Sequence, residues 1–530
     1  MNAHQVRKYW PVLVYVALFA LTAGFRFLAL KSGFVNDHFV YISGGRQMLF
    51  GEWPTRDWID PGLPLMFAAS AFAQKVFGPT LFAEAMLVSI AFGLAAALTA
   101  AGVKQLTGSM TLALLATVIE VAVFPRTYSY PKIVAYAAAF LVYGWYVKHP
   151  AKERVVAMAL VIATAFLFRH DHGLFLGVGA ALAILIASQR RVADLATLAT
   201  ATLLLLLPYL LYVQLHGGLA LYFRNGVEFS RREAARQWHI WPRVFGDERP
   251  LESAMVYELY LLPVLALGIL AMSRGRTDWR ETAARVAPLA VVALLVNFSF
   301  VRDPLNTRLA DAIVPAVFIG AWLLLRAVSA RGLRFVSVPF AAAFLVLFGA
   351  SVLAVGSTYE EIDRAGLLGR RQEIPHRFVE RTADLQQRFV DYQMPTRASR
   401  LLVPFFQYVD RCTKPDDRLL VGGFMVEVPF YAQRLFAAGQ EYFGAYFSSD
   451  ANERFAFARL RRQRVPFALI PSDESEGFDH SFPLVAPYVR AHYAPLTDVP
   501  VDEDQSIQIL VSRDLPVTGR DHETGWPCFQ

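Results

Sequence analysis

The segment from Phe34 to Leu65 gathers polar side chains that could do chemistry between strongly apolar stretches. It holds three aspartates, Asp37, Asp57 and Asp60, together with two arginines, two tryptophans and three prolines. A carboxylate beside a bilayer is costly to bury unless it has a partner or a function. This segment is therefore the first candidate for an active site.

Asp37 has the position that a general base would need. The stretch NDHFVYISGGRQML predicts a short amphipathic helix that starts near Asp37. A carboxylate there can take the proton of an acceptor hydroxyl at hydrogen-bond distance. An ordinary helix cap is the alternative, because Asn and Asp are favoured capping residues. Asp57 and Asp60 could likewise be turn residues before Pro61, and Arg56 could form a simple salt bridge with Asp57.

Four further polar stretches interrupt the apolar sequence: PRTYSYPK (125–132), RHDH (169–172), the long loop 216–254 and RDPLNTR (302–308). Arginine and lysine bind phosphate, and aromatic or hydroxyl neighbours suit a pyranose ring. The arginine-rich long loop could instead be an amphipathic helix on lipid headgroups. The residues expected to contact substrate are His38, Asp57, Asp60, Tyr128, Lys132, Arg169, His170, Asp171, Arg302, Asp303 and Arg308.

A metal site is not expected in RHDH. Histidine and aspartate can bind a divalent ion, but adjacent positions in a short turn rarely bring three ligands together. No other cofactor is expected.

The composition indicates a membrane protein. Of 530 residues, 55% are hydrophobic and only 18% are charged. Apolar runs long enough to cross about 30 Å of hydrocarbon recur along the chain. The expected spans are 11–31, 80–103, 109–125, 131–147, 153–169, 173–188, 192–215, 255–272, 286–301, 313–329 and 335–355. The first is read as an uncleaved signal anchor. The net charge of +7 does not indicate nucleic acid, since membrane proteins concentrate Lys and Arg in cytoplasmic loops.

The basic clusters fall in alternate loops and so predict an orientation. They place the N-terminus in the cytoplasm and everything after about residue 356 outside. Residues 62–77 must then form an interfacial or re-entrant helix, which leaves about 11 spans. The first outer loop (32–61), the long outer loop (216–254) and the three shorter polar stretches all share the outer face.

The last third of the chain predicts a separate domain. DRLLVGGF, VPFALIPSD and SIQILVSR are typical of strands, and ANERFAFARLRRQR and SFPLVAPYVRAHY of helices. The expected fold is a polytopic α-helical membrane domain (1–355) followed by a small extracytoplasmic α/β domain (356–530). Cys412 and Cys528 both lie in this second domain, and the sequence alone does not say whether they pair.

Together these features resemble the GT-C superfamily of polytopic glycosyltransferases, in particular its protein O-mannosyltransferase and aminoarabinose transferase branch, with its many uncharacterised bacterial members. The resemblance rests on VNDHFVY after the first span and on QMLFGEWPTRDWIDPGLPL. PRTYSYPK after the third span, RHDHG after the fifth, and RDPLNTR before a Pro-containing span support it. It covers the membrane domain, whereas the tail matches only in general layout.

The resemblance implies inverting transfer of a hexose or pentose from a polyprenyl-phosphate donor to a lipid, glycan or protein acceptor. It also implies a multi-pass protein of a bacterial inner membrane, with membrane lipids around it. Asp37 would act as the base or orient the acceptor. The cations that would stabilise the leaving phosphate are Lys132, Arg169, Arg302 and Arg308.

The sequence also departs from that family. Protein mannosyltransferases usually carry Asp-Glu where this chain has Asp37 and His38, and PRTYSYPK lacks an acidic residue that relatives often have. Many bacterial relatives show a histidine where this chain has Asn306-Thr307-Arg308. These differences leave the sugar and the acceptor open and argue against a protein mannosyltransferase.

Two other functions remain alternatives. A transporter would be expected to show paired halves with broken helices, which the sequence lacks. A ligase or polymerase of lipid-linked glycans would use similar residues.

Overall fold

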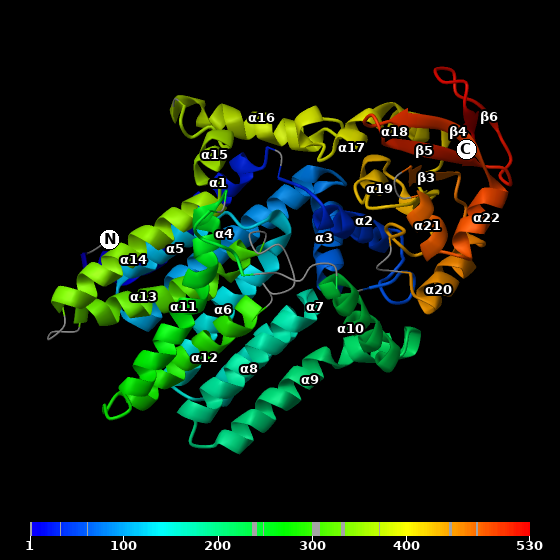
Figure 1. Cartoon of the computed structure of the whole chain (residues 1–530). Helices are drawn as coiled ribbons and strands as arrows, with labels where there is room; N and C mark the ends of the chain where they lie inside the picture. The colour runs from blue at the N-terminus through cyan, green and yellow to red at the C-terminus, as the bar shows by residue number, and fades with distance from the viewer. Residues whose placement is uncertain are drawn as a thin grey trace. The chain divides into compact units, whose positions relative to one another are not determined.

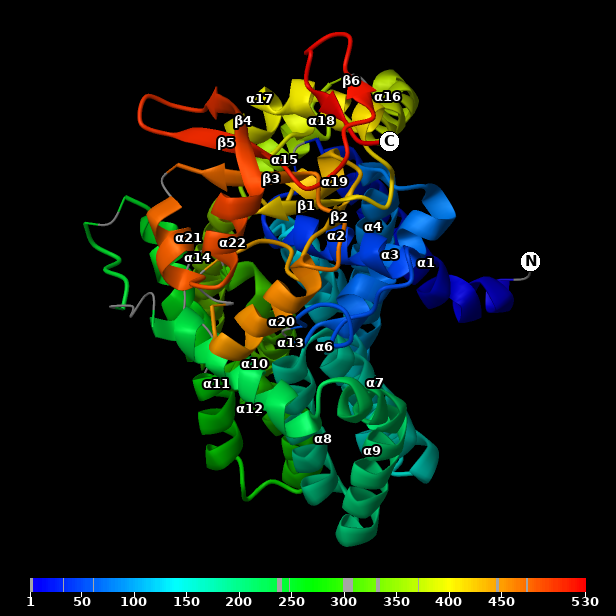
Figure 2. The same ribbon diagram turned by 90° about the vertical axis from the view of Figure 1, so that its right-hand side faces the viewer.

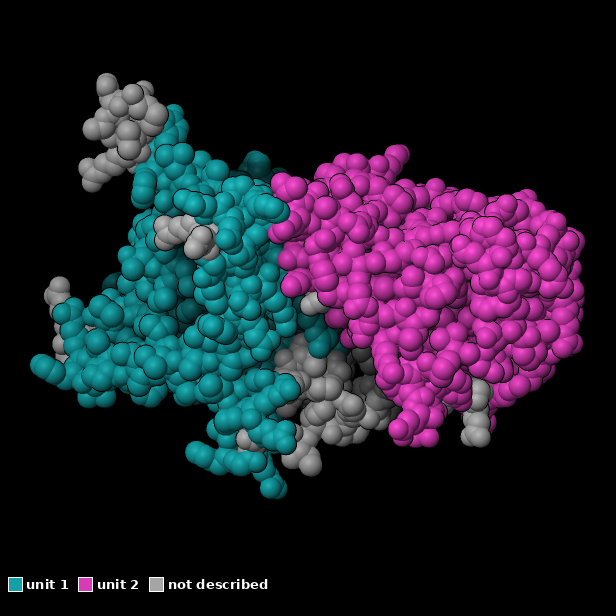
Figure 3. All heavy atoms as spheres, turned by 90° about the horizontal axis from the view of Figure 1, so that it is seen from above, with its two compact units in different colours: residues 1–29, 88–211, 233–377 teal, residues 30–87, 212–232, 378–530 magenta. Residues whose placement is uncertain are grey.

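The computed structural model describes residues 3–31, 33–60, 62–235, 241–246, 248–298, 308–329, 334–369, 371–444, 448–472 and 475–530 (Figure 1). These residues form two compact units. Unit 1 comprises residues 1–29, 88–211 and 233–377, and unit 2 comprises residues 30–87, 212–232 and 378–530 (Figure 3). The first outer loop thus belongs to the same unit as the C-terminal residues.

Each of the eleven expected spans is found as a helix. These helices are α1 (Ala3–Ala29), α4 (Leu81–Thr107), α5 (Met110–Ala122), α6 (Tyr130–Lys148), α7 (Lys152–Phe168), α8 (His170–Ala187), α9 (Arg191–His216), α11 (Pro250–Met272), α12 (Trp279–Phe298), α13 (Ile313–Ser329) and α14 (Arg334–Val355). Among the described residues, eight of them are long and apolar enough to cross a membrane; α5, α6 and α7 are the other three. The chain is therefore a multi-pass membrane protein, with fewer clear spans than expected because α5 and α7 have only 13 and 17 residues.

Two shorter helices follow α1 in sequence. They are α2 (Asp37–Leu49) and α3 (Pro64–Phe77), which pack against each other in unit 2. With 14 residues, α3 is too short to span the hydrocarbon alone. Glycines of α2 allow the close approach: a Cβ on Gly44 would lie 2.3 Å from the Phe67 ring. The long loop 216–254 contains the helix α10 (Leu219–Ala235).

Small residues also bring the helices of unit 1 together. Helix α8 packs on α7 and α12, while α13 lies against α5, α11 and α14 (Figure 1). A Cβ on Gly179 of α8 would lie 2.7 Å from Val292 of α12. In a bilayer the hydrophobic effect does not drive helices together, so helices associate by close packing, which small residues permit.

The sheet expected in the last third of the chain is present and belongs to unit 2, whereas residues 356–377, which were expected in the same domain, belong to unit 1. The sheet has the strand order β2-β1-β3-β5-β4 (Figure 2). The strands are β1 (Arg418–Val421), β2 (Leu435–Phe436), β3 (Phe467–Pro471), β4 (Tyr493–Pro500) and β5 (Ser506–Ser512). β1 is parallel to β2 and β3, whereas β5 is antiparallel to β3 and β4. The expected strands correspond to β1, β3 and β5.

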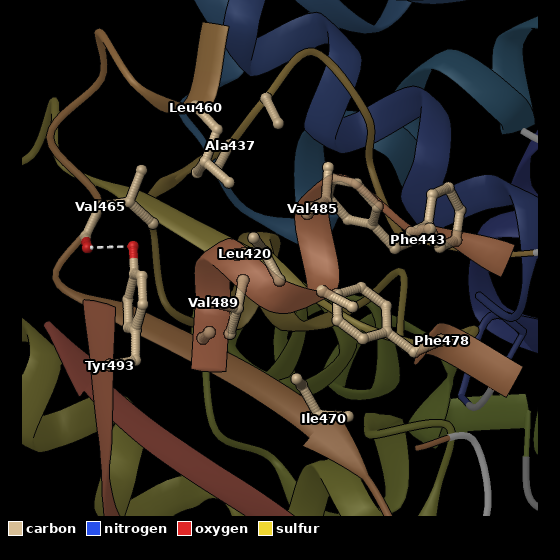
Figure 4. Packing of buried hydrophobic residues seen from close by; sticks show 14 of the residues in the cluster. Leu420, Ala437, Phe443, Leu460, Val465, Ile470, Phe478, Val485, Val489 and Tyr493 are labelled. Carbon is tan, nitrogen blue, oxygen red and sulfur yellow. Dashed lines mark hydrogen bonds between the residues drawn. The ribbon is translucent and has the colours of Figure 1, made fainter. Parts of the chain in front are cut away.

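Helices cover both faces of this sheet. On one face, Ala468 and Ile470 of β3 join a buried cluster with α20 (Asp450–Leu460), α21 (Ser475–Ser481) and α22 (Val485–His492) (Figure 4). The Tyr493 hydroxyl donates to the carbonyl of Val465 at 2.9 Å beside this cluster. On the other face, Phe467 packs edge-on against Phe405 of α18 (Val403–Cys412). Successive side chains of β3 therefore pack into hydrophobic cores on opposite faces of the sheet, as the alternation of side chains along a strand requires.

The remaining elements belong to the C-terminal third of the chain, the first of them in unit 1 and the last four in unit 2. They are α15 (Thr358–Arg364), α16 (Ile374–Gln386), α17 (Arg397–Leu401), α19 (Val428–Tyr431), β6 (Gly519–Arg520) and β7 (Pro527–Cys528). Cys412 at the end of α18 forms a disulfide with Cys528 of β7. The pairing that the sequence left open is thus settled.

Candidate functional site

In unit 1, an ion pair joins two of the polar stretches that the sequence singles out. The ammonium group of Lys132, in the first turn of α6, lies 2.5 Å from a carboxylate oxygen of Asp311. Asp311 belongs to a short 3-10 helix, Leu309–Ala312, that leads into α13. The two side chains are each 11% exposed, so the pair is well shielded from solvent.

A second ion pair forms at the sharp connection between α7 and α8. Arg169 is the single extended residue between the two helices, with φ −167° and ψ 119°. Its Nε lies 3.0 and 3.2 Å from the two carboxylate oxygens of Asp171. Asp171 also accepts from the His172 backbone N–H at 2.9 Å, in the first turn of α8, where the helix favours negative charge.

A glycine is required just after this connection. A Cβ on Gly173 would lie 2.5 Å from Cα of Phe166, which belongs to the preceding helix. Glycine thus lets α7 and α8 meet closely enough to hold RHDH in a tight corner.

Aromatic side chains of the same stretches make further contacts. The Tyr136 hydroxyl shares a hydrogen bond with Nδ1 of His172, and both side chains are buried. The ring of His170 stacks on Phe166 with 4.2 Å between the ring centroids. Tyr128 is half-buried and accepts a hydrogen bond from Arg126. The corner is therefore fixed by side-chain contacts as well as by the backbone.

Charges from three stretches act on one another in this cluster. Arg169 and Arg308 both repel the charge of Lys132, while Asp311 attracts it. We call Lys132, Arg169, Asp171, Arg308 and Asp311 the cationic cluster. Three cations and two carboxylates give it a surplus of positive charge, which suits a phosphate. Arg302 and Asp303, from the same stretch as Arg308, lie outside the described residues.

In unit 2, Asp37 is an exposed residue at the start of α2. The N-cap position belongs to Asn36, whose φ of 50° and ψ of −127° form a backbone conformation that residues other than glycine rarely adopt. The Asn36 side chain makes no capping hydrogen bond. Asp37 is therefore the first helical residue, where the amide groups of the helix favour a carboxylate.

His38 lies on the buried side of the same helix. Its Nε2 is 3.1 Å from a Glu84 oxygen, and the Ser70 hydroxyl donates to the other oxygen of that carboxylate. His38 and Glu84 are each 1% exposed. This contact ties α2 to α3 and to the start of α4.

Asp57 and Glu52 anchor the first outer loop to the C-terminal residues of the same unit. Asp57 forms salt bridges with Arg56 at 2.6 Å and with Arg459 at 3.3 Å. The first of these is the salt bridge that the sequence left open. Glu52 accepts hydrogen bonds from Arg418 and Arg459, each at 2.8 Å. Beside them, Trp58 is fully buried, with its ring edge-on to Phe67 and Phe436.

Asp60 stabilises a turn and also lies close enough to Glu441 for the two carboxyl groups to influence each other. One of its oxygens accepts from the backbone N–H groups of Gly62 and Leu63 at 2.8 Å, and the other accepts from Tyr222 at 3.3 Å. The nearby Glu441 is 3% exposed, and burial, reinforced by the charge of Asp60, raises its pKa to about 8. Glu441 is thus held largely protonated at neutral pH.

Neither protein-family models nor curated proteins match this sequence. Among solved structures, the chain is similar to ArnT from Cupriavidus metallidurans bound to undecaprenyl phosphate. The TM-score is 0.54 at 15% identity, over 94% of this chain and 98% of that one. An oligosaccharyltransferase from Archaeoglobus fulgidus, in a complex with zinc and sulfate, gives a TM-score of 0.44 at 13% identity, over 91% and 71% of the two chains.

The chain has a GT-C fold. The likeness to ArnT extends over nearly the whole of both chains, so it includes the C-terminal residues as well as the helices. From the sequence alone, the C-terminal residues resembled that superfamily only in the general order of their expected elements.

Several polar residues of this GT-C fold were not singled out from the sequence. They are Glu52, Glu84, Tyr136, Asp311 and Glu441. Asp311 follows RDPLNTR by three residues, so its place beside a polar stretch was the one available signal. Among the residues that the structure describes, no three His, Cys, Asp or Glu side chains gather as a metal site would require.

Proposed function

We propose that this protein is a membrane glycosyltransferase that moves a sugar from a polyprenyl-phosphate donor to an acceptor hydroxyl. One observation carries the proposal: Lys132 lies 2.5 Å from Asp311, three residues after Arg308, and the charges of Arg169 and Arg308 act on it, so cations of three distant stretches influence one another. The GT-C fold supports it, since ArnT, which shares this fold, was solved with undecaprenyl phosphate bound.

The cationic cluster would act on the leaving group. As the bond between the anomeric carbon and the phosphate oxygen breaks, negative charge grows on the polyprenyl phosphate. Fixed cations aimed at that charge stabilise the transition state more than the ground state. The carboxylates of Asp171 and Asp311 keep two of these cations in place before the donor arrives.

Asp37 would act on the acceptor. Its carboxylate removes the proton of the attacking hydroxyl, whose oxygen bonds to the anomeric carbon as the phosphate leaves from the opposite side. The configuration at that carbon is thereby inverted. Asp37 is exposed at the start of α2, whereas the neighbouring His38 is buried against Glu84.

A transporter is the second candidate. It would also need a cationic site for an anionic substrate, but it would not need a general base. Asp37 thus separates the two functions. A ligase or polymerase of lipid-linked glycans would use the same chemistry with a larger acceptor.

The test uses the full-length protein in detergent with radiolabelled polyprenyl-phosphate sugars and lipid, glycan and peptide acceptors. Wild type should transfer label, and Asp37→Asn should lower the rate at least 100-fold while donor binding is kept. Asp504→Asn, an exposed aspartate of the β4–β5 turn, is the matched control. Full transfer by Asp37→Asn would refute the role of Asp37, and donor uptake into proteoliposomes without transfer would favour the transporter.

A further inference from the structure

A large apolar cavity lies within unit 1, among α5, α11, α13 and α14. Its volume is about 470 Å³. Its walls are mainly aliphatic and aromatic side chains, such as Leu262, Leu324 and Phe344. Other lining residues, Val317 and Phe348, are at most 4% exposed. The cavity therefore enters the helix bundle.

One end of this cavity carries positive charge. Arg276, from the connection between α11 and α12, and Arg326, from the last turn of α13, both line it. Arg326 lies 3.7 Å from Asp278 and 3.2 Å from the Thr282 hydroxyl. Within the described part of the chain, the guanidinium group of Arg276 has no hydrogen-bond or ion-pair partner. Two guanidinium groups thus line this end of the cavity, and only that of Arg326 has a carboxylate partner among the described residues.

Hydroxyl groups lie at the same end. Ser329 closes α13 and Ser337 belongs to the first turn of α14, and both line the cavity. An apolar cavity that ends in arginine and serine side chains matches a molecule with a long hydrocarbon chain and an anionic headgroup.

This end is far from the cationic cluster. Asp311 precedes α13 and Arg326 lies near its end, 15 residues later. At about 1.5 Å per helical residue, the two are about 22 Å apart. A phosphate at Arg276 and Arg326 is therefore a different phosphate from one bound at Lys132.

We propose that the cavity binds one anionic membrane phospholipid, with an acyl chain between the four helices and its phosphate at Arg276 and Arg326. Arginine binds phosphate with two parallel hydrogen bonds, and an unpartnered guanidinium leaves those donors available. The basic loops at this end are the ones that the sequence predicts to face the cytoplasm, where anionic lipids are abundant. The lipid joins α13 to α14 and α11 and so stabilises the bundle.

The headgroup contact is tested by lipid retention. Full-length protein is purified in detergent, incubated with phosphatidylglycerol, phosphatidylcholine or polyprenyl phosphate, and weighed intact by native mass spectrometry. Wild type should keep one phosphatidylglycerol per chain, and Arg276→Gln should lower its occupancy at least tenfold. Arg274→Gln is the matched control, because Arg274 is exposed in the same connection but does not line the cavity.

The chain contact is tested by filling the cavity. Gly320 of α13 lines it, and a Cβ added there meets no atom within 4 Å, so Gly320→Leu places an apolar side chain in the cavity. Gly268→Leu on α11 is the control: a Cβ there also meets nothing, but Gly268 is exposed and outside the lining. Gly320→Leu should abolish retention, and Gly268→Leu should retain lipid as wild type does.

Four results would overturn the proposal. They are retention of both lipids equally, retention of polyprenyl phosphate alone, a dimer that dissociates in Gly320→Leu without any bound lipid, and no bound lipid in wild type. None of these readouts uses sugar transfer. A failure here therefore leaves the proposed enzymatic function to its own test.

Discussion

Lys132 and Asp311 are 179 residues apart in the sequence, yet the Lys132 ammonium lies 2.5 Å from the Asp311 carboxylate. The pair joins the first turn of α6 to the residues that lead into α13. It therefore fixes a cation at the meeting point of two polar stretches. Removing either partner would leave the other as a shielded, unpaired charge, which commonly costs about 3 to 5 kcal/mol.

We expect Lys132→Met to lower both the thermal stability and the rate of sugar transfer. The substitution leaves the Asp311 carboxylate without its cation and removes a group that would bind phosphate. The double variant Lys132→Met with Asp311→Leu should regain most of the thermal stability, since no charge is left unpaired. It should still transfer at least tenfold more slowly than wild type. Unfolding temperature and initial rate, measured on the same preparations, separate the two effects. Recovery of wild-type transfer by the double variant would show that the pair is only structural.

Glu52 connects the first outer loop to two arginines of the C-terminal residues. Its side chain is 16% exposed, and one of its carboxylate oxygens, Oε1, lies 2.8 Å from both Arg418 and Arg459. Glu52→Gln keeps the shape but removes the charge that both guanidinium groups face. We expect unit 2 to lose about 1 to 3 kcal/mol, because these are charge-assisted hydrogen bonds.

The measurement for Glu52 is thermal unfolding together with limited proteolysis of the 50–60 loop. Glu503→Gln, an exposed glutamate of the β4–β5 turn, is the control and should behave as wild type. Equal unfolding temperatures for Glu52→Gln and the control would mean that the ion pairs do not hold the loop.

Much of the helical fold follows from the sequence because long apolar runs have few alternatives. All eleven expected spans are helices, and β1, β3 and β5 were also expected. The strand β2 has only two residues, too few for a pattern. The strand β4 contains two prolines and lies at the sheet edge, the one place where a strand tolerates them.

The candidate site could be predicted only in part. Alternating basic loops placed Lys132, Arg169 and Arg308 on one face, and in the structure the charges of Arg169 and Arg308 act on Lys132. Asp311 lies at the entry of an apolar helix, where a carboxylate is unexpected without knowledge of its lysine. Glu52 is 366 residues from Arg418, and no local pattern encodes a contact at that separation.

The disulfide between Cys412 and Cys528 closes a loop with a sequence separation of 116 residues. A crosslink over that length restricts the unfolded chain and is worth about 4 to 5 kcal/mol in the chain-entropy description. Cys412→Ala with Cys528→Ala should therefore lower the unfolding temperature of the full-length protein. A reducing agent should lower that of wild type and leave the double variant unchanged. An identical response of both proteins would mean that the two thiols do not pair in solution.

Glu441 predicts a pH dependence of stability. Burial and the charge of Asp60 raise its pKa from the ordinary 4.5 to about 8. Below pH 4.5 the side chain is protonated in both the folded and the unfolded chain, so it adds no dependence. Between pH 4.5 and 8 the folded state keeps a proton that the unfolded state releases. The free energy of unfolding contributed by this group therefore falls by about 1.4 kcal/mol per pH unit.

Glu441→Gln cannot ionise, so this contribution disappears. The variant should gain stability relative to wild type as the pH rises from 5 to 8, and the difference should level off above pH 8. Unfolding of both full-length proteins in detergent, followed at several pH values, measures that difference. Glu503→Gln again serves as the control, since an exposed glutamate should not alter the slope. Parallel curves for wild type and Glu441→Gln would show that Glu441 ionises normally and that its burial does not control the stability of unit 2.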